Sequence, residues 1–171
     1  MIILMAGLPA TGKSTLCREL ALRLDGTVLD KDKIRAALFS PSEIEYSIEQ
    51  DDFCMKIVLE TATYVLRRNP SRFVFVDGRP FSRAYQIEQA LEVATDLKQE
   101  WRILECRCSE ETARKRLAEQ GTSGEHPAAN RDYELYVRVK SLFEEIRMTK
   151  VVIDTDQPVD VCVQRSLKAL T

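Results

Sequence analysis

Residues 7–14 read G-L-P-A-T-G-K-S and match the pattern G-x-x-x-x-G-K-S/T at every fixed position. The apolar run before them, residues 1–6 (M-I-I-L-M-A), predicts a buried strand, and apolar residues at helical spacing across 14–24 predict a helix after them. A strand, a glycine-rich turn and a helix in this order are typical of the phosphate-binding loop called the Walker A motif. The alternative is an ordinary glycine turn, but a chance match in such a chain is expected on the order of once in a hundred.

Each part of this loop has a physical role toward a nucleoside triphosphate. Gly7 and Gly12 allow tight turns that present backbone N–H groups, and the helix N-terminus adds positive potential. Lys13 supplies charge for the β- and γ-phosphates, and the Ser14 hydroxyl is a hard oxygen ligand for Mg²⁺. We therefore expect ATP, or else GTP, together with Mg²⁺. The residues expected to bind the nucleotide are Gly7, Leu8, Pro9, Ala10, Thr11, Gly12, Lys13, Ser14 and Thr15.

Length and composition limit the class of protein. A chain of 171 residues is expected to form one domain, and a net charge of −2 with a pI of about 5.6 gives no global basic field for bulk nucleic-acid binding. No apolar run approaches the roughly 18 residues that a membrane span requires. The first strand begins at residue 2, which leaves no room for a signal peptide, so we expect a cytoplasmic protein. Nothing in the sequence indicates an oligomeric state.

The cysteines and the histidine indicate neither disulfides nor a metal site. Five cysteines are an odd number, and their spacing matches no disulfide framework. A metal pair at Cys106 and Cys108 is less favoured than ordinary thiols. His126 is the sole histidine and lies in a polar segment at 121–127, where we expect a surface residue.

Short apolar runs alternate with longer segments of helical periodicity along the whole chain. This alternation predicts a parallel five-stranded sheet covered by helices on both faces, a three-layer αβα sandwich in one domain over residues 1–171. The expected strands are 1–6, 27–30, 72–76, 101–108 and 150–154. The expected helices are 14–24, 31–39, 46–68, 82–97, one that follows a cap at Ser109, 130–147 and 159–170, with a loop at 121–127.

Polar residues follow four of these strands at the point where each strand ends. They are Gly7, Asp30, Asp77 and Asp154. Ligands of open parallel sheets bind beyond the carboxyl ends of the strands. We therefore expect these residues to surround one binding region.

Asp32 and Arg35 follow the second strand and are three residues apart at a helix start, on one face of its first turn. Phosphoryl transfer to an alcohol needs a carboxylate that orients the acceptor hydroxyl and takes its proton, with cations around the phosphoryl oxygens. The alternative is an aspartate that caps the helix beside an exposed arginine.

Asp77, Gly78 and Arg79 end the third strand. The aspartate suits a Mg²⁺ ion with its water shell, or the acceptor, and the glycine allows close backbone approach. Arg79 and Arg83 suit a phosphate or the substrate. The alternative is an Asp-Gly turn with two surface arginines.

Arg114, Lys115 and Arg116 are consecutive, so they do not all face one way on a helix. They precede the breaker-rich segment 121–127, and a mobile lid over about 114–131 would bring one or two of them over the γ-phosphate and exclude water. The alternative is a solvated basic helix face.

Four stretches occur in the order seen in a known family of P-loop kinases. They are G-L-P-A-T-G-K-S, D-K-D-K-I-R, V-F-V-D-G-R-P-F-S-R and V-V-I-D-T-D. The chain resembles the AAA_33-type group, which is similar to the kinase domain of phage polynucleotide kinase, chloramphenicol phosphotransferase and zeta toxin. The resemblance covers most of the chain and implies a P-loop NTPase fold with strand order 2-3-1-4-5.

The resemblance also implies roles for individual residues. In that group the aspartate of D-x-x-R activates the acceptor hydroxyl and the arginine binds the acceptor or a phosphate, which carries onto Asp32 and Arg35. The aspartate that ends the third strand approaches the acceptor or the metal water, which carries onto Asp77. The arginine on the helix that leads into the lid falls on Arg116.

The chain departs from the polynucleotide kinase pattern at one position of the lid. A second lid arginine is expected four residues after the first, where this sequence has Gln120. The γ-phosphate clamp is then incomplete unless Arg114 or Arg131 replaces that arginine.

Together these features predict a kinase that moves the γ-phosphate of ATP to a hydroxyl of a small molecule or of a nucleic-acid 5′ end. The acceptor itself is left open, and a nucleotide-dependent switch or slow ATPase that acts as a regulatory binding module is the alternative function. The expected catalytic residues are Lys13, Asp32 and Arg116, the expected substrate-binding residues are Arg35, Asp77 and Arg79, and the expected Mg²⁺ ligand is Ser14.

Overall fold

The computed structural model describes residues 1–123 and 132–170, with the backbone alone for residues 120–123. His126, Arg131 and the last part of the lid expected at 114–131, residues 124–131, lie outside these residues, as does the side chain of Gln120. In the described ranges, no helix combines the length and the apolar character needed to cross a membrane.

Five parallel strands form one sheet, as the sequence predicts. They are β1 (Ile2–Ala6), β2 (Thr27–Asp30), β3 (Val74–Asp77), β4 (Trp101–Arg107) and β5 (Val151–Asp154). Their order is β2-β3-β1-β4-β5, which confirms the order implied by the resemblance. The central strand β1 pairs with both neighbours, so that Leu4 lies opposite Val76 of β3 and Ile103 of β4.

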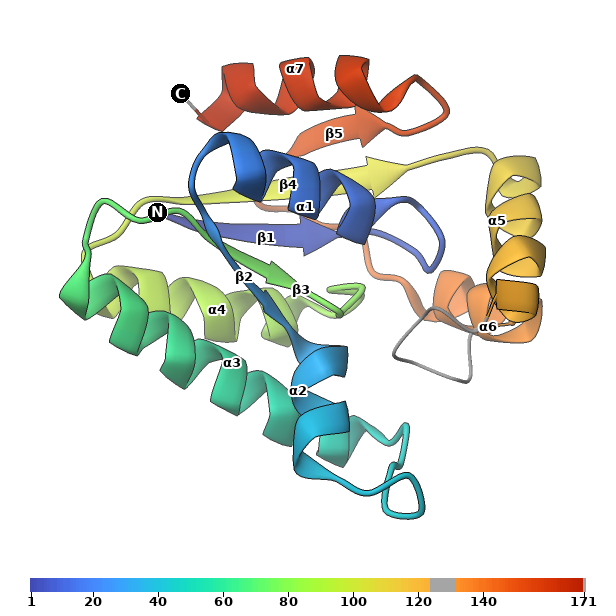
Figure 1. Ribbon diagram of the computed structural model, residues 1–171, viewed down its shortest axis with the longest axis horizontal. Coiled ribbons are helices and arrows are strands. Elements are labelled where there is room, and N and C mark those ends of the chain that lie inside the picture. Colours follow the sequence, from blue (N-terminus) through green and yellow to red (C-terminus); the bar gives the residue numbers. More distant parts are fainter. Residues whose placement is uncertain (124–131, 171) are drawn as a thin grey trace.

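Helices cover both faces of the sheet, and two further helices lie beyond the carboxyl ends of its strands (Figure 1). They are α1 (Lys13–Arg23), α2 (Lys31–Leu38), α3 (Ile48–Arg68), α4 (Ala84–Asp96), α5 (Glu110–Ser123), α6 (Tyr133–Leu142) and α7 (Val159–Leu170). Helices α1 and α7 cover one face, and α3 and α4 cover the other. Helices α5 and α6 lie beyond the carboxyl ends of the strands.

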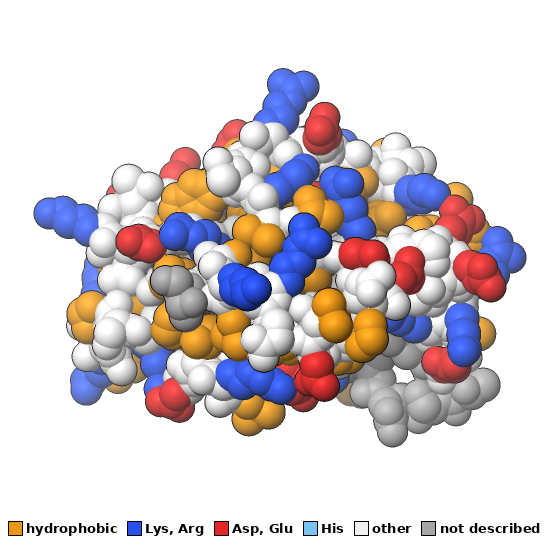
Figure 2. Space-filling model, turned by 90° about the horizontal axis from the view of Figure 1, so that it is seen from above, with side chains coloured by type: hydrophobic (Ala, Val, Ile, Leu, Met, Phe, Trp, Pro, Cys, Tyr) orange, Lys and Arg blue, Asp and Glu red, His pale blue; other side chains and the backbone are white. Residues whose placement is uncertain are grey.

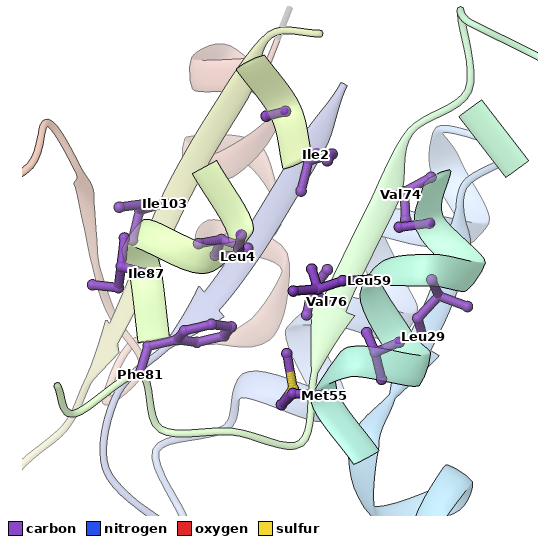
Figure 3. Packing of buried hydrophobic residues seen from close by; sticks show 14 of the residues in the cluster. Ile2, Leu4, Leu29, Met55, Leu59, Val74, Val76, Phe81, Ile87 and Ile103 are labelled. Carbon is purple, nitrogen blue, oxygen red and sulfur yellow. The ribbon is translucent and has the colours of Figure 1, made fainter. Parts of the chain in front are cut away.

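The alternation of side chains along β1 divides the core into two halves. Ile2 and Leu4 point toward α3 and α4, whereas Ile3 and Met5 point toward α1 and α7, and all four are fully buried. Figure 3 shows the first half, where Leu4 lies among side chains of the sheet and of the covering helices. Because both faces of the strand are buried, it reads as a continuous apolar run.

The outer face formed by α1 and α7 carries mixed charge. In Figure 2, basic, acidic and apolar side chains intermingle over this face. Leu22 of α1 is 78% exposed and is followed by Arg23. The described part of this face therefore offers no continuous basic surface of the kind that binds a nucleic-acid backbone.

Helix α3 differs from the sequence prediction in its start and in its buried face. It begins after Ser47, whose hydroxyl accepts a hydrogen bond from the backbone N–H of Gln50 at 3.2 Å, and not at Tyr46. The helical spacing of Phe53, Ile57, Val58, Thr61 and Val65 predicts the buried face, but Phe53 is 51% exposed. The buried residues of α3 are Cys54, Met55, Val58, Leu59, Ala62 and Leu66. Val58 is common to the predicted and the observed face, and packing against the sheet buries Cys54 in place of Phe53.

Two further boundaries are wrong in the prediction. Helix α5 continues to Ser123, so residues 121–123 are helical and not loop. Helix α6 ends at Leu142, because Phe143 takes an extended conformation and the chain turns toward α4. There Glu144 accepts a hydrogen bond from the Ala84 N–H at 2.9 Å, which satisfies an open group at the start of α4.

Leu4→Ala tests the packing of the central strand. We expect the free energy of unfolding to fall by about 2–5 kcal/mol, because the side chain is fully buried between elements that close around it. Urea unfolding followed by circular dichroism measures this change. The matched control, Leu22→Ala on the exposed face of α1, is expected to stay within about 0.5 kcal/mol of the wild type. Equal losses in both variants would contradict this account of the core.

Candidate active site

The glycine-rich loop between β1 and α1 has a backbone that only glycine suits at two positions. Gly7 and Gly12 have φ values of 131° and 77°. A Cβ atom at Gly7 would lie 2.3 Å from the carbonyl oxygen of Cys106 on β4, so no side chain fits there. Gly12 is the N-cap residue of α1 and supplies no side-chain hydrogen bond, which leaves the first N–H groups of the helix open to an anion.

Lys13 folds back over this loop. Its Nζ atom donates to the carbonyl oxygens of Gly7 at 2.9 Å and of Leu8 at 2.7 Å, and the residue is 5% exposed. Ser14 follows it on the first turn of α1, and both residues line the same cavity. The two groups expected to meet phosphate and Mg²⁺ therefore lie side by side at the helix start.

Arg116 lies against the same loop, as the prediction for the lid helix requires. Its guanidinium donates to the carbonyl oxygen of Thr155 at 2.7 Å and to that of Ala10 at 3.3 Å. The Thr155 hydroxyl in turn donates to the carbonyl oxygen of Thr11 at 2.9 Å. Thr155 follows β5, within the stretch V-V-I-D-T-D, and the sequence alone assigned no role to its side chain.

Arg114 turns the other way. Its guanidinium lies 4.1 Å from the centre of the Tyr133 ring on α6. Of the two alternatives to Arg116 for the phosphate clamp, Arg114 is thus engaged with α6 in this conformation, and Arg131 lies outside the described residues. Arg116 is the lid-helix arginine that the described structure brings to the loop.

The ends of β2 and β3 meet as expected, and Gly78 allows them to do so. Asp30 and Asp77 lie opposite each other in the register of the two strands. A Cβ atom at Gly78 would lie 2.7 Å from the Asp30 Oδ1 atom and 2.8 Å from the Lys31 nitrogen. Asp30 Oδ1 accepts a hydrogen bond from the Asp32 N–H at 2.9 Å, so Asp30 is the residue that caps α2.

Asp32 is therefore not a helix cap, and its carboxylate lies inside an ion-pair cluster. Arg35 donates to Asp32 at 3.0 Å, and Lys31 Nζ lies 3.2 Å from the same oxygen. Arg35 is 2% exposed, which contradicts the alternative of an exposed arginine beside a cap. The two residues are together, as the D-x-x-R spacing predicts.

Asp77 and Arg79 are also buried, so the alternative of a surface Asp-Gly turn is wrong for them. The Oδ1 atom of Asp77 has no hydrogen-bond partner in the part of the chain that the structure describes. Arg83 differs, since it lies nearer the surface and pairs with Glu144 at 3.0 Å. The structure thus separates Arg79, which lines the cavity, from Arg83, which holds the start of α4.

Two aspartates of α3 complete this region and were missed by sequence analysis. Asp51 forms ion pairs with Arg35 and, at 2.7 Å, with Lys31. Asp52 forms an ion pair with Arg79. The available signal was a pair of acidic residues near the start of a helix, which the helix dipole explains equally well.

The carboxylates at this edge act on one another. Burial, and then the charges of Asp77 and Asp32, raise the pKa of Asp30 above its ordinary value. Burial lowers the pKa of the Lys31 amine, against the opposing effect of Asp32. Negative charge is therefore concentrated where β2 and β3 end.

These residues enclose a cavity of about 140 Å³ that adjoins the loop. Its lining includes Pro9, Lys13, Ser14, Asp30, Lys31, Asp32, Arg35, Tyr46, Asp51, Asp77, Gly78, Arg79, Pro80, Leu135 and Val139. The last two come from α6, so the helix that follows the lid contributes one wall. The volume is below the roughly 300 Å³ at which pockets for drug-sized ligands begin, so a compact ligand fits.

Comparison with known proteins agrees with this geometry. The family model AAA_33, described as an AAA domain, matches residues 2–146. The chain is 30% identical over 132 residues to an adenylate kinase from Campylobacter jejuni, and the match covers 68% of this chain and 65% of that protein. The chain thus spans slightly less than two thirds of the length of that relative.

Solved structures share the fold over nearly the whole chain. The APS kinase CysC of Mycobacterium tuberculosis, in complex with AMPPNP and APS, superposes with a TM-score of 0.73 at 18% identity, covering 99% of this chain and 96% of that chain. Kti12 of Chaetomium thermophilum, in complex with ADP-AlF3, gives a TM-score of 0.68 at 15% identity, with both chains covered completely. At these identities the likeness shows the fold.

Gly78→Ala tests the approach of β3 to the start of α2. We expect the free energy of unfolding to fall by about 1–3 kcal/mol, because φ is 86° at this position and the added carbon would meet Asp30 Oδ1. Thermal unfolding measures the change. An unaltered melting temperature would show that the two strand ends do not need this contact.

Proposed function

This chain belongs to the AAA_33 family, and on that premise we propose that it is a kinase that transfers the γ-phosphate of ATP to a hydroxyl group. The acceptor would be a small molecule or a nucleic-acid 5′ end. One observation carries the proposal: Asp32 is a buried carboxylate that lines one cavity with Lys13 and Ser14 of the nucleotide loop. Named kinases among its relatives support a nucleotide-dependent phosphotransferase and leave the acceptor open.

The loop fits a nucleotide with Mg²⁺ on its own geometry. The positive φ values of Gly7 and Gly12 let the loop turn tightly, and the N–H groups at the start of α1 have no side-chain cap. Lys13 and the loop amides would hold the β- and γ-phosphates, and the Ser14 hydroxyl would bind Mg²⁺. The metal supplies charge neutralisation for the transferred group and for its leaving oxygen.

Asp32 is proposed to accept the proton of the acceptor hydroxyl. Its ion pairs with Arg35 and Lys31 hold the carboxylate in place, and a general base has to be held within reach of the proton that it takes. Arg35 and Arg79 would position the acceptor, together with Asp77. Each of these side chains is nearly buried, so the geometry is set before the acceptor binds.

Arg116 is proposed to neutralise charge on the transferred phosphoryl group. It already lies against Ala10 of the loop, and its partner Thr155 anchors the same loop from the end of β5. A cation held at this place stabilises the charge that spreads over the equatorial oxygens.

Asp32→Asn is expected to reduce phosphoryl transfer by about 10²-fold or more while the affinity for ATP stays nearly unchanged, because the amide does not accept the hydroxyl proton. A coupled assay of ADP release with an identified acceptor, together with calorimetric titration of ATP, measures both quantities. Asp96→Asn, an exposed aspartate at the end of α4, is the control and is expected to match the wild type. Full turnover in Asp32→Asn would rule out this assignment.

Lys13→Ala is expected to lose both ATP affinity and activity, because the amine is the cation placed for the β- and γ-phosphates. Calorimetric titration with ATP and Mg²⁺ measures the affinity. Arg18→Ala removes one positive charge from the exposed side of the same helix and is expected to bind ATP as the wild type does. Equal affinity in the two variants would contradict the role of Lys13.

A screen for ADP release across hydroxyl compounds and 5′-OH oligonucleotides identifies the acceptor class. A kinase is expected to release ADP only with certain acceptors, and Asp32→Asn is expected to abolish this acceptor-dependent release. ADP release that needs no acceptor and survives the substitution would instead identify a slow ATPase acting as a regulatory switch.

A further inference from the structure

Two consecutive aspartates of α3 each neutralise one buried arginine of the acceptor cavity. Asp51 pairs with Arg35, and Asp52 pairs with Arg79. Both guanidinium groups belong to residues that are 2% exposed. The positive charges that would attract an anionic acceptor are therefore already matched by carboxylates of the protein.

The charges of the residues that line the cavity also disfavour an anionic acceptor. Among the described residues that line it, four are basic and four are acidic, and one of the basic residues, Lys13, serves the nucleotide loop. Asp52 adds a further carboxylate behind Arg79. Among the described residues, the acceptor side thus holds more acidic than basic side chains. Burial, and then the charges of Asp77 and Asp32, raise the pKa of Asp30 at this place.

Three buried polar atoms belong to residues that line the cavity. They are the Nε atoms of Arg35 and Arg79 and the Oδ1 atom of Asp77, all buried and without a hydrogen-bond partner in the described part of the chain. The first two donate and the third accepts. A hydroxyl group both donates and accepts hydrogen bonds, whereas sulfate and carboxylate anions only accept and would be repelled by the Asp77 carboxylate.

We propose that Asp51 and Asp52 make this cavity selective for an uncharged, hydroxyl-bearing acceptor and against acceptors that carry a phosphate, sulfate or carboxylate group. This inference rests on the proposed phosphotransferase function and narrows its substrate class, since a nucleic-acid 5′ end is a polyanion. The two carboxylates are anchored on one helix, so they compete for the arginines as intramolecular ligands at high effective concentration. An anion from solution has to displace them.

The test is calorimetric titration of sulfate into protein saturated with AMPPNP and Mg²⁺, at constant ionic strength. The analogue fills the β- and γ-phosphate positions, so sulfate has no access to the nucleotide loop. We expect no saturable sulfate binding in the wild type. Asp51→Asn and Asp52→Asn are each expected to gain saturable binding, at least about tenfold tighter than any wild-type signal. Glu60→Gln, the same change on the exposed side of α3, is expected to behave as the wild type.

Saturable sulfate binding in the wild type that is lost in Arg35→Gln or Arg79→Gln would overturn the proposal. A lack of gain in both asparagine variants, with melts that show them folded, would also overturn it. The wild-type titration tests the proposal even where a variant does not fold. The measured quantity is anion binding, which does not depend on phosphoryl transfer. Failure of the proposed kinase function would appear instead as ADP release that needs no acceptor.

Discussion

Buried positive charge is the constraint on which the catalytic edge of this molecule depends. Arg35 and Arg79 come from α2 and from the end of β3, and both are almost completely buried. Removing one partner of a buried ion pair typically costs about 3–5 kcal/mol, because the remaining charge is left without compensation. The start of α3 must therefore stay where Asp51 and Asp52 reach the two guanidinium groups. That position of α3 closes the wall of the cavity.

The nucleotide side of the site is built on a different principle, which is close contact between backbones. Gly7 passes directly over the Cys106 carbonyl of β4, and Thr155, after β5, bonds to the Thr11 carbonyl of the loop. Three neighbouring strands thus support one loop. Side-chain charge shapes the acceptor half, while strand packing shapes the nucleotide half, and the two halves meet at Lys13 and Asp32.

Much of this arrangement is predictable because the relevant signals are local. Strands that are buried on both faces appear as apolar runs, and the residues that end them lie at one edge of a parallel sheet whatever the details of packing. Asp30 and Asp77 follow from that rule alone. The buried face of α3 cannot be predicted from a local signal of this kind. Phe53 and Cys54 are neighbours in an amphipathic segment, and the faces to which they belong have similar apolar content.

The sequence by itself determined the phosphate-binding loop, the order of strands and helices, and the edge where the polar residues gather, because each depends on a few adjacent residues. The tertiary structure alone decided which charges pair. Asp51 and Asp52 lie 16 and 27 residues from the arginines that they hold, and no local pattern encodes that distance. It also decided that Arg116, and not Arg114, faces the loop, because consecutive residues of a helix point in different directions and only packing shows which direction is occupied.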